Sequence, residues 1–232
     1  MRVRDIIERV QPDQDFMAKF SDAVDEALAE YQDFLQSNDD VDDIDELAGY
    51  LDAELGDPDF DDLINININV DNNVKKSDWW MTAEARGGEN EDGGRVYEID
   101  INLNAKNMKG IYGPKTFKKI IMRLIRHEMI HINQYQRVPD LGDLISGYQK
   151  SSADGGRHWE TTYLRDPHEL MAFADTLSQE MLDTDDPQAA LRNPDAYREL
   201  LPTWARFRRI FTKDTPQIRA LLKYTSQYLE KS

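Results

Sequence analysis

The motif His-Glu-x-x-His, formed by His127, Glu128 and His131, constrains the fold and the chemistry of this chain more than any other feature. It lies in the segment 114–136, where apolar side chains recur at three- and four-residue steps, as is typical of a long amphipathic helix. Two histidines four positions apart lie one turn from each other on one helical face, so their imidazoles can share a metal ion. The glutamate between them can act as general base on a metal-bound water.

The position of the motif on the helix supports this interpretation. At about 100° per residue, Glu128 falls near the centre of the apolar stripe, with His127 and His131 toward one edge. Charged and imidazole groups on a core-facing surface are costly unless they are paired or bound to a metal. The position therefore argues against the alternative of a surface helix with incidental histidines.

A zinc site also needs a third protein ligand and one open position for water. The chain has no cysteine, and its other two histidines are His158 and His168. The best candidate is Glu169, which lies 38 residues after His131. Pro167 is typical of the first turn of a helix, so Glu169 is expected near the start of a second helix.

Two segments carry a resemblance to a known family: 127–134, His-Glu-Met-Ile-His-Ile-Asn-Gln, and 167–174, Pro-His-Glu-Leu-Met-Ala-Phe-Ala. They resemble the gluzincin clan of zinc metallopeptidases, and especially small gluzincin-like proteins, many of them phage-encoded. The resemblance covers residues 62–183. It implies zinc (Zn2+) as cofactor, His127, His131 and Glu169 as its ligands, and Glu128 as general base. The larger gluzincins carry an aspartate four residues after the ligand glutamate, where this chain has Phe173; Asp175 is six residues after it.

Gluzincins also resemble one another in using a tyrosine or histidine to stabilise the oxyanion of the tetrahedral intermediate. The segment 137–166 lacks clear periodicity and is predicted to be a functional loop between the two ligand-bearing helices. Tyr163 is the candidate for this role because it lies just before the glutamate helix, and His158 is the rival. Tyr148, Trp159 and Arg165 are further candidates in this segment.

The remaining pattern predicts an α+β protein. Helical periodicity marks 13–37 and 42–55, whereas alternation of apolar and polar residues marks strands at 63–70, 79–86 and 95–104. The strands are expected to form a meander. One edge strand is expected to border the site, where an extended peptide could add, and the third strand is the candidate by chain order. The expected fold is a zincin-like minimal core of a small three-stranded or larger sheet, the His-Glu-x-x-His helix and the glutamate helix, flanked by N- and C-terminal helices. The predicted divisions are an acidic helical region (1–61), the peptidase core (62–183) and a C-terminal helical region (184–232).

The net charge of −17 is concentrated at one end of the chain. Residues 1–62 carry 21 acidic and 4 basic side chains, whereas the remaining 170 residues carry 24 of each. Such a region repels phosphates, which argues against nucleic-acid binding. It could instead serve as a docking surface for a protein partner or for virion assembly. A solvated helical face is the simpler interpretation.

These observations predict a zinc metallopeptidase, a hydrolase acting on a peptide or protein substrate. The alternative is a non-catalytic, phage- or virion-associated structural or interaction protein on a zincin scaffold. No apolar run is long enough to cross a membrane, and the start lacks the apolar core of a signal peptide. With no cysteine in the chain, the expected location is the cytoplasm, or the host cytoplasm or virion if the protein is phage-encoded.

Overall fold

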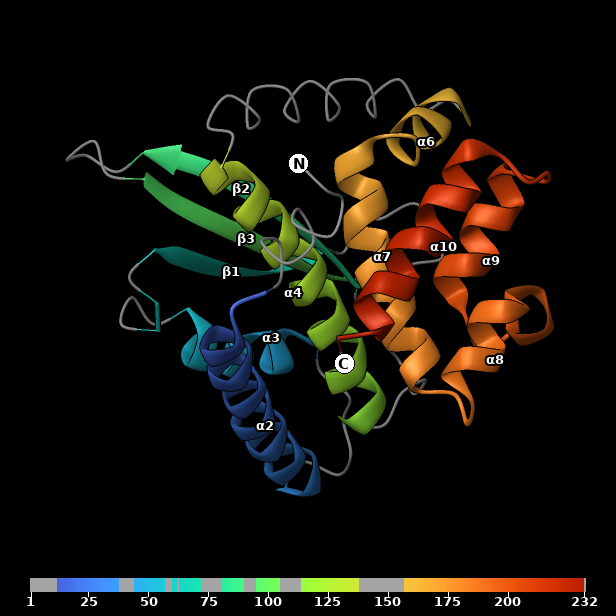
Figure 1. Cartoon of the computed structure of the whole chain (residues 1–232). Helices are drawn as coiled ribbons and strands as arrows, with labels where there is room; N and C mark the ends of the chain where they lie inside the picture. Colours follow the sequence, from blue (N-terminus) through green and yellow to red (C-terminus); the bar gives the residue numbers. More distant parts are fainter. Residues whose placement is uncertain are drawn as a thin grey trace. The chain divides into compact units, whose positions relative to one another are not determined.

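The computed structural model describes residues 12–37, 44–56, 60–61, 63–71, 81–89, 95–104, 114–137 and 157–231. In this part of the chain, helices accompany one small mixed sheet, so the predicted α+β class is confirmed (Figure 1). The chain forms two compact units: one is Pro12–Ile132, and the other contains the chain from Asn133 onward.

The sheet has three strands, β1 (Ile64–Asp71), β2 (Met81–Glu89) and β3 (Arg95–Asn104), in the order β1-β3-β2. β3 runs parallel to β1 and antiparallel to β2, and Ile99 of β3 lies opposite Ile66 on one side and Ala85 on the other. The predicted meander, and the predicted edge position of the third strand, are therefore wrong. β3 is the central strand, and its apolar side chains are the most completely buried of the sheet; among the strands that the structure describes, β2 lies at an edge.

The alternating pattern of the strands separates a buried face from a polar face. Ile64 and Ile66 of β1 are buried, as are Met81 and Ala85 of β2 and the apolar residues of β3. Asn65, Asn67 and Asn69 are exposed, as predicted from the alternation. Three asparagines at alternate positions are tolerated in β1 because their side chains lie on the exposed face of the sheet.

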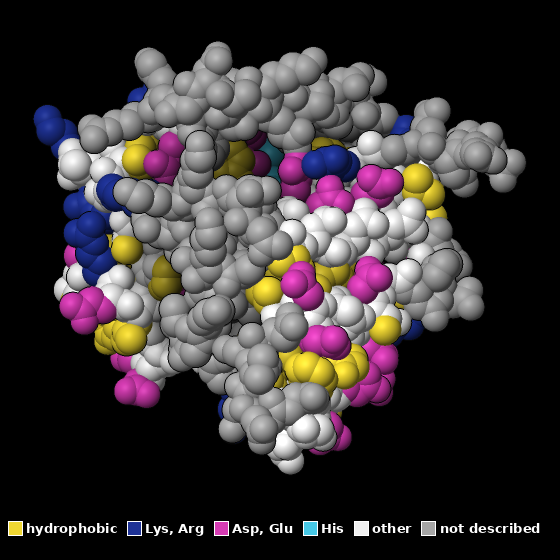
Figure 2. All heavy atoms as spheres, turned by 180° about the vertical axis from the view of Figure 1, so that it is seen from behind, with side chains coloured by type: hydrophobic (Ala, Val, Ile, Leu, Met, Phe, Trp, Pro, Cys, Tyr) yellow, Lys and Arg dark blue, Asp and Glu magenta, His cyan; other side chains and the backbone are white. Residues whose placement is uncertain are grey.

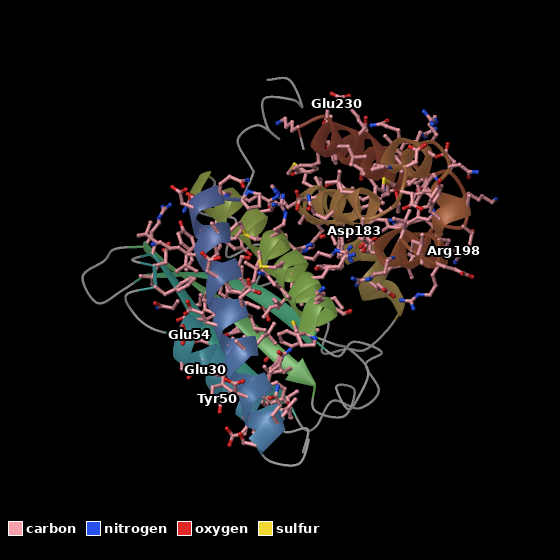
Figure 3. All side chains as sticks on the ribbon, turned by 90° about the horizontal axis from the view of Figure 1, so that it is seen from below. Glu30, Tyr50, Glu54, Asp183, Arg198 and Glu230 are labelled. Atoms are coloured by element: carbon pink, nitrogen blue, oxygen red, sulfur yellow. The ribbon has the colours of Figure 1, made fainter. Side chains whose placement is uncertain are left out.

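The unit that holds the sheet also contains α2 (Gln14–Ser37), α3 (Ile44–Leu55) and most of α4 (Pro114–Arg137). Asp13 begins α2 by accepting hydrogen bonds from the amides of Asp15 and Phe16. α3 packs against α2 and against β1, while acidic side chains such as Glu30 and Glu54 extend from the two helices (Figure 3). The helices predicted at 13–37, 42–55 and 114–136 are confirmed to within two residues.

The second unit contains α6 (Arg157–Tyr163), α7 (Pro167–Leu182), α8 (Pro187–Arg192), a 3-10 helix (Pro194–Tyr197), α9 (Pro202–Ile210) and α10 (Pro216–Leu229). α7 is its central element, and α8, α9 and α10 pack on it. The segment 137–166 was expected to be irregular, but Arg137 belongs to α4 and Arg157–Tyr163 form helix α6, so the expectation is wrong there. Residues 138–156, which include Tyr148, lie outside the described residues.

No helix in the described ranges combines the length and the apolar character that a membrane crossing requires. The proposed division of the chain at residues 61/62 and 183/184 stays a prediction.

Candidate metal site

The first two ligand candidates, His127 and His131, come from one turn of α4. Their four-residue spacing places the imidazole rings beside each other, with centroids 4.9 Å apart and planes inclined at 71°. They are 7% and 5% exposed. On the face drawn in Figure 2, a small area of histidine surface is visible. Two polar rings are therefore withdrawn from water on the buried side of a helix.

The third candidate, Glu169, is placed by the first turn of α7. Asp166 is the N-cap of this helix, and its Oδ1 accepts a hydrogen bond of 2.7 Å from the His168 amide. Pro167 begins the helix, as predicted. Glu169 thus lies in the first turn, where the positive end of the helix dipole favours a negatively charged carboxylate. Its side chain is 7% exposed.

The structure brings the three predicted ligands together. One ligand atom from each of His127, His131 and Glu169 lies within 4.8 Å of the other two, and all three residues are buried. In a tetrahedral zinc centre with bonds of about 2.0–2.1 Å, neighbouring ligand atoms lie about 3.3 Å apart. The residues suit a metal ion in number and in atom type, and their ligand atoms lie close enough together that this group could hold one.

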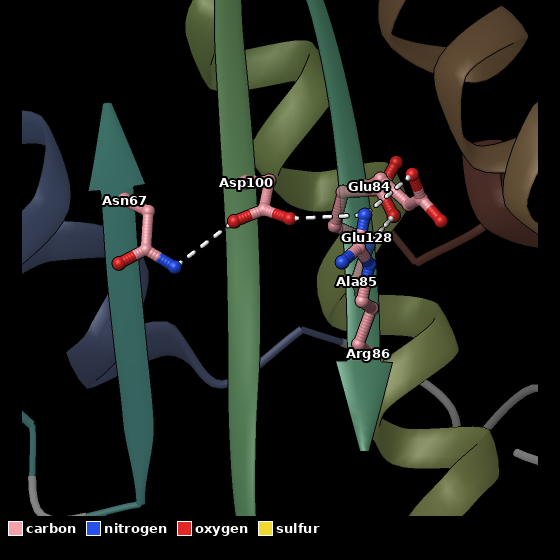
Figure 4. A network of polar contacts seen from close by, with 6 residues as sticks. All are labelled: Asn67, Glu84, Ala85, Arg86, Asp100 and Glu128. Carbon is pink, nitrogen blue, oxygen red and sulfur yellow. Dashed lines mark hydrogen bonds and ion pairs between the residues drawn. The ribbon is translucent and has the colours of Figure 1, made fainter. Parts of the chain in front are cut away.

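Glu128 lies in the same turn of α4 as the histidines and is bound by the sheet. Its Oε2 accepts a hydrogen bond of 2.8 Å from the backbone amide of Ala85 in β2, and the carboxylate is 6% exposed (Figure 4). A buried carboxylate without such a donor would be strongly destabilising. This hydrogen bond to the main chain of β2 fixes the orientation of the Glu128 carboxylate. The sequence could not predict this hydrogen bond, because every residue except proline has a backbone amide and the residue type therefore does not indicate which amide will donate.

A polar network on the exposed face of the sheet joins β2 to the other two strands. Asp100 of β3 accepts a 2.9 Å hydrogen bond from Asn67 of β1 and forms a 3.2 Å ion pair with Arg86 of β2 (Figure 4). Arg86 also pairs with Glu84, and this hydrogen bond and charge raise the pKa of the Arg86 guanidinium. The two β2 residues in this network, Glu84 and Arg86, flank Ala85 in the sequence. The network therefore links the part of β2 that binds Glu128 to the other two strands.

Tyr163, the candidate oxyanion stabiliser, ends α6 and lies among other side chains of its unit. Its ring meets Phe173 edge to face at 5.9 Å, and the guanidinium of Arg206 lies 5.8 Å from the ring centroid. Its role in catalysis stays a prediction. The backbone of the rival, His158, is part of α6, but its side chain is outside the described part of the structure, as is that of Trp159.

The two positions that depart from the larger gluzincins are both buried. Phe173, four residues after Glu169, packs against Phe207 at 5.5 Å and beneath Arg206 at 5.1 Å. Phe173 therefore belongs to an aromatic cluster of the second unit. Asp175 is 1% exposed and lies further along the same helix.

Comparisons with protein-family models, with curated proteins and with solved structures find no match to this chain. The resemblance to gluzincins therefore rests on the two short segments of α4 and α7, and a zincin-like fold stays a prediction. The buried group of His127, His131 and Glu169 stands independently of that resemblance.

Proposed function

We propose that this protein is a zinc-dependent peptidase that hydrolyses peptide bonds in a peptide or protein substrate. The observation that carries the proposal is the buried group of two histidines and a glutamate, with Glu128 on the same helical turn. Catalytic zinc sites use three protein ligands and keep a position for water, whereas structural sites use four. A group of two histidines and one glutamate matches the ligand set of such a catalytic site.

The chemistry assigns distinct tasks to the residues. A bound zinc ion would polarise the scissile carbonyl and lower the pKa of a water molecule at its open position. Glu128 would accept a proton from this water and later donate it to the leaving amine. The hydrogen bond from Ala85 supports this role, because it holds the carboxylate in one orientation before the substrate binds.

The sheet supports a peptide as the substrate class. β2 is an edge strand, and its Ala85 amide is in direct contact with Glu128. An extended peptide that adds to such an edge by main-chain hydrogen bonds would run beside the proposed general base. We therefore propose β2, and no longer the third strand, as the edge to which a substrate peptide adds.

Glu128→Gln tests the proposal, because it removes the proton acceptor but keeps all three proposed ligands. We expect turnover of a peptide library, read by mass spectrometry of the fragments, to fall by about 100-fold or more, with the zinc content unchanged. Glu98→Gln is the matched control, because Glu98 is exposed on the polar face of the sheet. Full activity of Glu128→Gln would contradict the assigned role, and a zinc-loaded wild type that cleaves no peptide would contradict the peptidase.

A further inference from the structure

The backbone of His168, the residue that precedes Glu169, is held at both of its polar atoms. The His168 amide donates to the Asp166 carboxylate at 2.7 Å, and the His168 carbonyl accepts a hydrogen bond of 3.3 Å from Nε2 of Gln134. The first of these bonds is an ordinary helix cap. The second comes from another helix, because Gln134 belongs to α4. The backbone carbonyl next to a proposed metal ligand is thus bound by a side chain 34 residues away.

Gln134 is also linked in position to the histidines. It follows His131 by three residues in an uninterrupted helix, which places it about 4.5 Å further along the axis on the neighbouring turn. Its side chain is 4% exposed. Because Gln134 and His131 share one helix, the backbone positions of these two residues are fixed relative to each other.

We infer that Gln134 is a positioning residue that sets Glu169 in place for the metal. It would act through the His168 carbonyl, which is directly bonded to the Glu169 amide nitrogen and leaves the Glu169 backbone little freedom to move. This inference rests on the proposed zinc site and adds a residue that determines metal affinity without touching the metal. Replacing residues that orient metal ligands typically weakens metal binding by about 10- to 100-fold.

A primary amide suits this task for chemical reasons. Its Nε2 donates to a carbonyl without bringing a charge into a buried place. A glutamate of the same length would direct a carboxylate at the carbonyl oxygen, and a methionine would fill the space but donate nothing. Gln134→Met therefore removes the hydrogen bond with little change in volume, and Gln134→Asn keeps the donor but shortens its reach by one methylene.

The test compares zinc affinity, measured by competition with a chromophoric chelator on the full chain, for the wild type and three variants. Thr225→Val is the matched control: Thr225 is buried, and its hydroxyl donates to the Leu221 carbonyl in α10. It therefore loses one buried side-chain hydrogen bond to a backbone carbonyl, as Gln134→Met does. Urea unfolding of the metal-free proteins gives the stability of each variant, and the absorption bands of bound Co2+ report ligand geometry.

We expect Gln134→Met to weaken zinc binding by roughly 10- to 100-fold and to alter the Co2+ bands, with Gln134→Asn between it and the wild type. Thr225→Val should lower stability but leave zinc affinity unchanged. Wild-type zinc affinity in Gln134→Met, or in Gln134→Asn if the first variant does not fold, would overturn the positioning role alone. A wild type that binds neither Zn2+ nor Co2+ would overturn this inference together with the metal site.

Discussion

Glu128 is a carboxylate on a helical face that also carries Ile121, Ile125 and Ile132, each of them at most 1% exposed. An apolar residue at this position would remove the need to satisfy a buried charge. The chain instead holds the carboxylate with the Ala85 amide. A polar residue kept on a core face at an energetic cost is typical of functional sites, where local rules of folding are broken for chemistry.

Phe173 shows the opposite behaviour, because an apolar residue stands where the larger gluzincins carry an aspartate. Its ring packs with Tyr163 and Phe207 and lies beneath Arg206. These contacts assign the position to the core of the second unit. Any support that Glu169 receives must then come from elsewhere, and Gln134 and Asp166 are the groups bound next to it.

Phe173→Ala should therefore behave as a core mutation. Phe173 is 8% exposed, and removal of its ring would leave a cavity, so the free energy of unfolding should fall by about 3–5 kcal/mol. Urea denaturation of the metal-free protein measures this change. Phe34→Ala is a suitable control, because Phe34 is only half-buried on α2 and its loss should cost much less. Equal losses for the two variants would contradict a core role for Phe173.

At the scale of elements, the sequence predicted the long helices α2, α3 and α4 but missed α6, and it did not predict how the strands pair. Helical periodicity is local, so α2, α3 and α4 could be recognised from their own residues. Strand order depends on contacts between distant segments, and chain order wrongly suggested a meander. A compositional signal was present: β2 contains Gly87, Gly88 and Arg86, which suit an edge, whereas β3 carries the apolar residues of a central strand.

Only the part of the candidate site that depends on local sequence patterns could be predicted. The spacing of His127 and His131 is local, and Glu169 could be selected because a helix starting at Pro167 was predictable. The Ala85 amide and the His168 carbonyl are main-chain groups brought in by tertiary packing. Their residue types carry no information about these contacts, so sequence reasoning could not have found them.

The junction of α7 with α9 depends on a buried carboxylate. Glu180 of α7 accepts hydrogen bonds from the amide of Thr203 at 3.1 Å and from its hydroxyl at 2.8 Å. Thr203 lies in the first turn of α9, whose N-cap residue Leu201 makes no side-chain cap bond. Glu180 thus takes the place of a local cap at the start of α9.

Thr203→Val should weaken this junction. The change keeps the shape of the side chain but removes the hydroxyl donor to Glu180, and we expect the free energy of unfolding to fall by about 1–3 kcal/mol. Thr176→Val is the control, because the Thr176 hydroxyl is bound to the Ala172 carbonyl of its own helix. If thermal and urea unfolding show the same small loss for both variants, Glu180 does not cap α9 in solution.

Across the whole molecule, the basic side chains of α9 are neutralised within their own unit. Arg209 pairs with Glu160 at 3.1 Å, and Arg208 pairs with Asp195 at 3.4 Å. Both arginines thus have acidic partners within the second unit. Glu30 and Asp33 of α2 are exposed to solvent. A docking role for that acidic region stays a prediction.

A metal ion would contribute to the stability of the molecule as well as to its chemistry. Ligands that are buried together without their metal bring polar groups out of water, and a bound ion offsets that cost. An ion that binds the folded chain alone stabilises it by about 2.7 kcal/mol at a free concentration of 100 times its Kd. The whole account therefore depends on whether the purified chain carries the metal.

The zinc content of the purified full chain, measured by elemental mass spectrometry, tests this claim most directly. We expect close to one zinc ion per wild-type chain, and loss of that zinc in His127→Ala and Glu169→Ala. Glu199→Ala, which removes an exposed carboxylate from the same unit as Glu169, should retain it. A wild type without zinc even after supplementation, or a Glu169→Ala variant with its full complement, would contradict the three-ligand site.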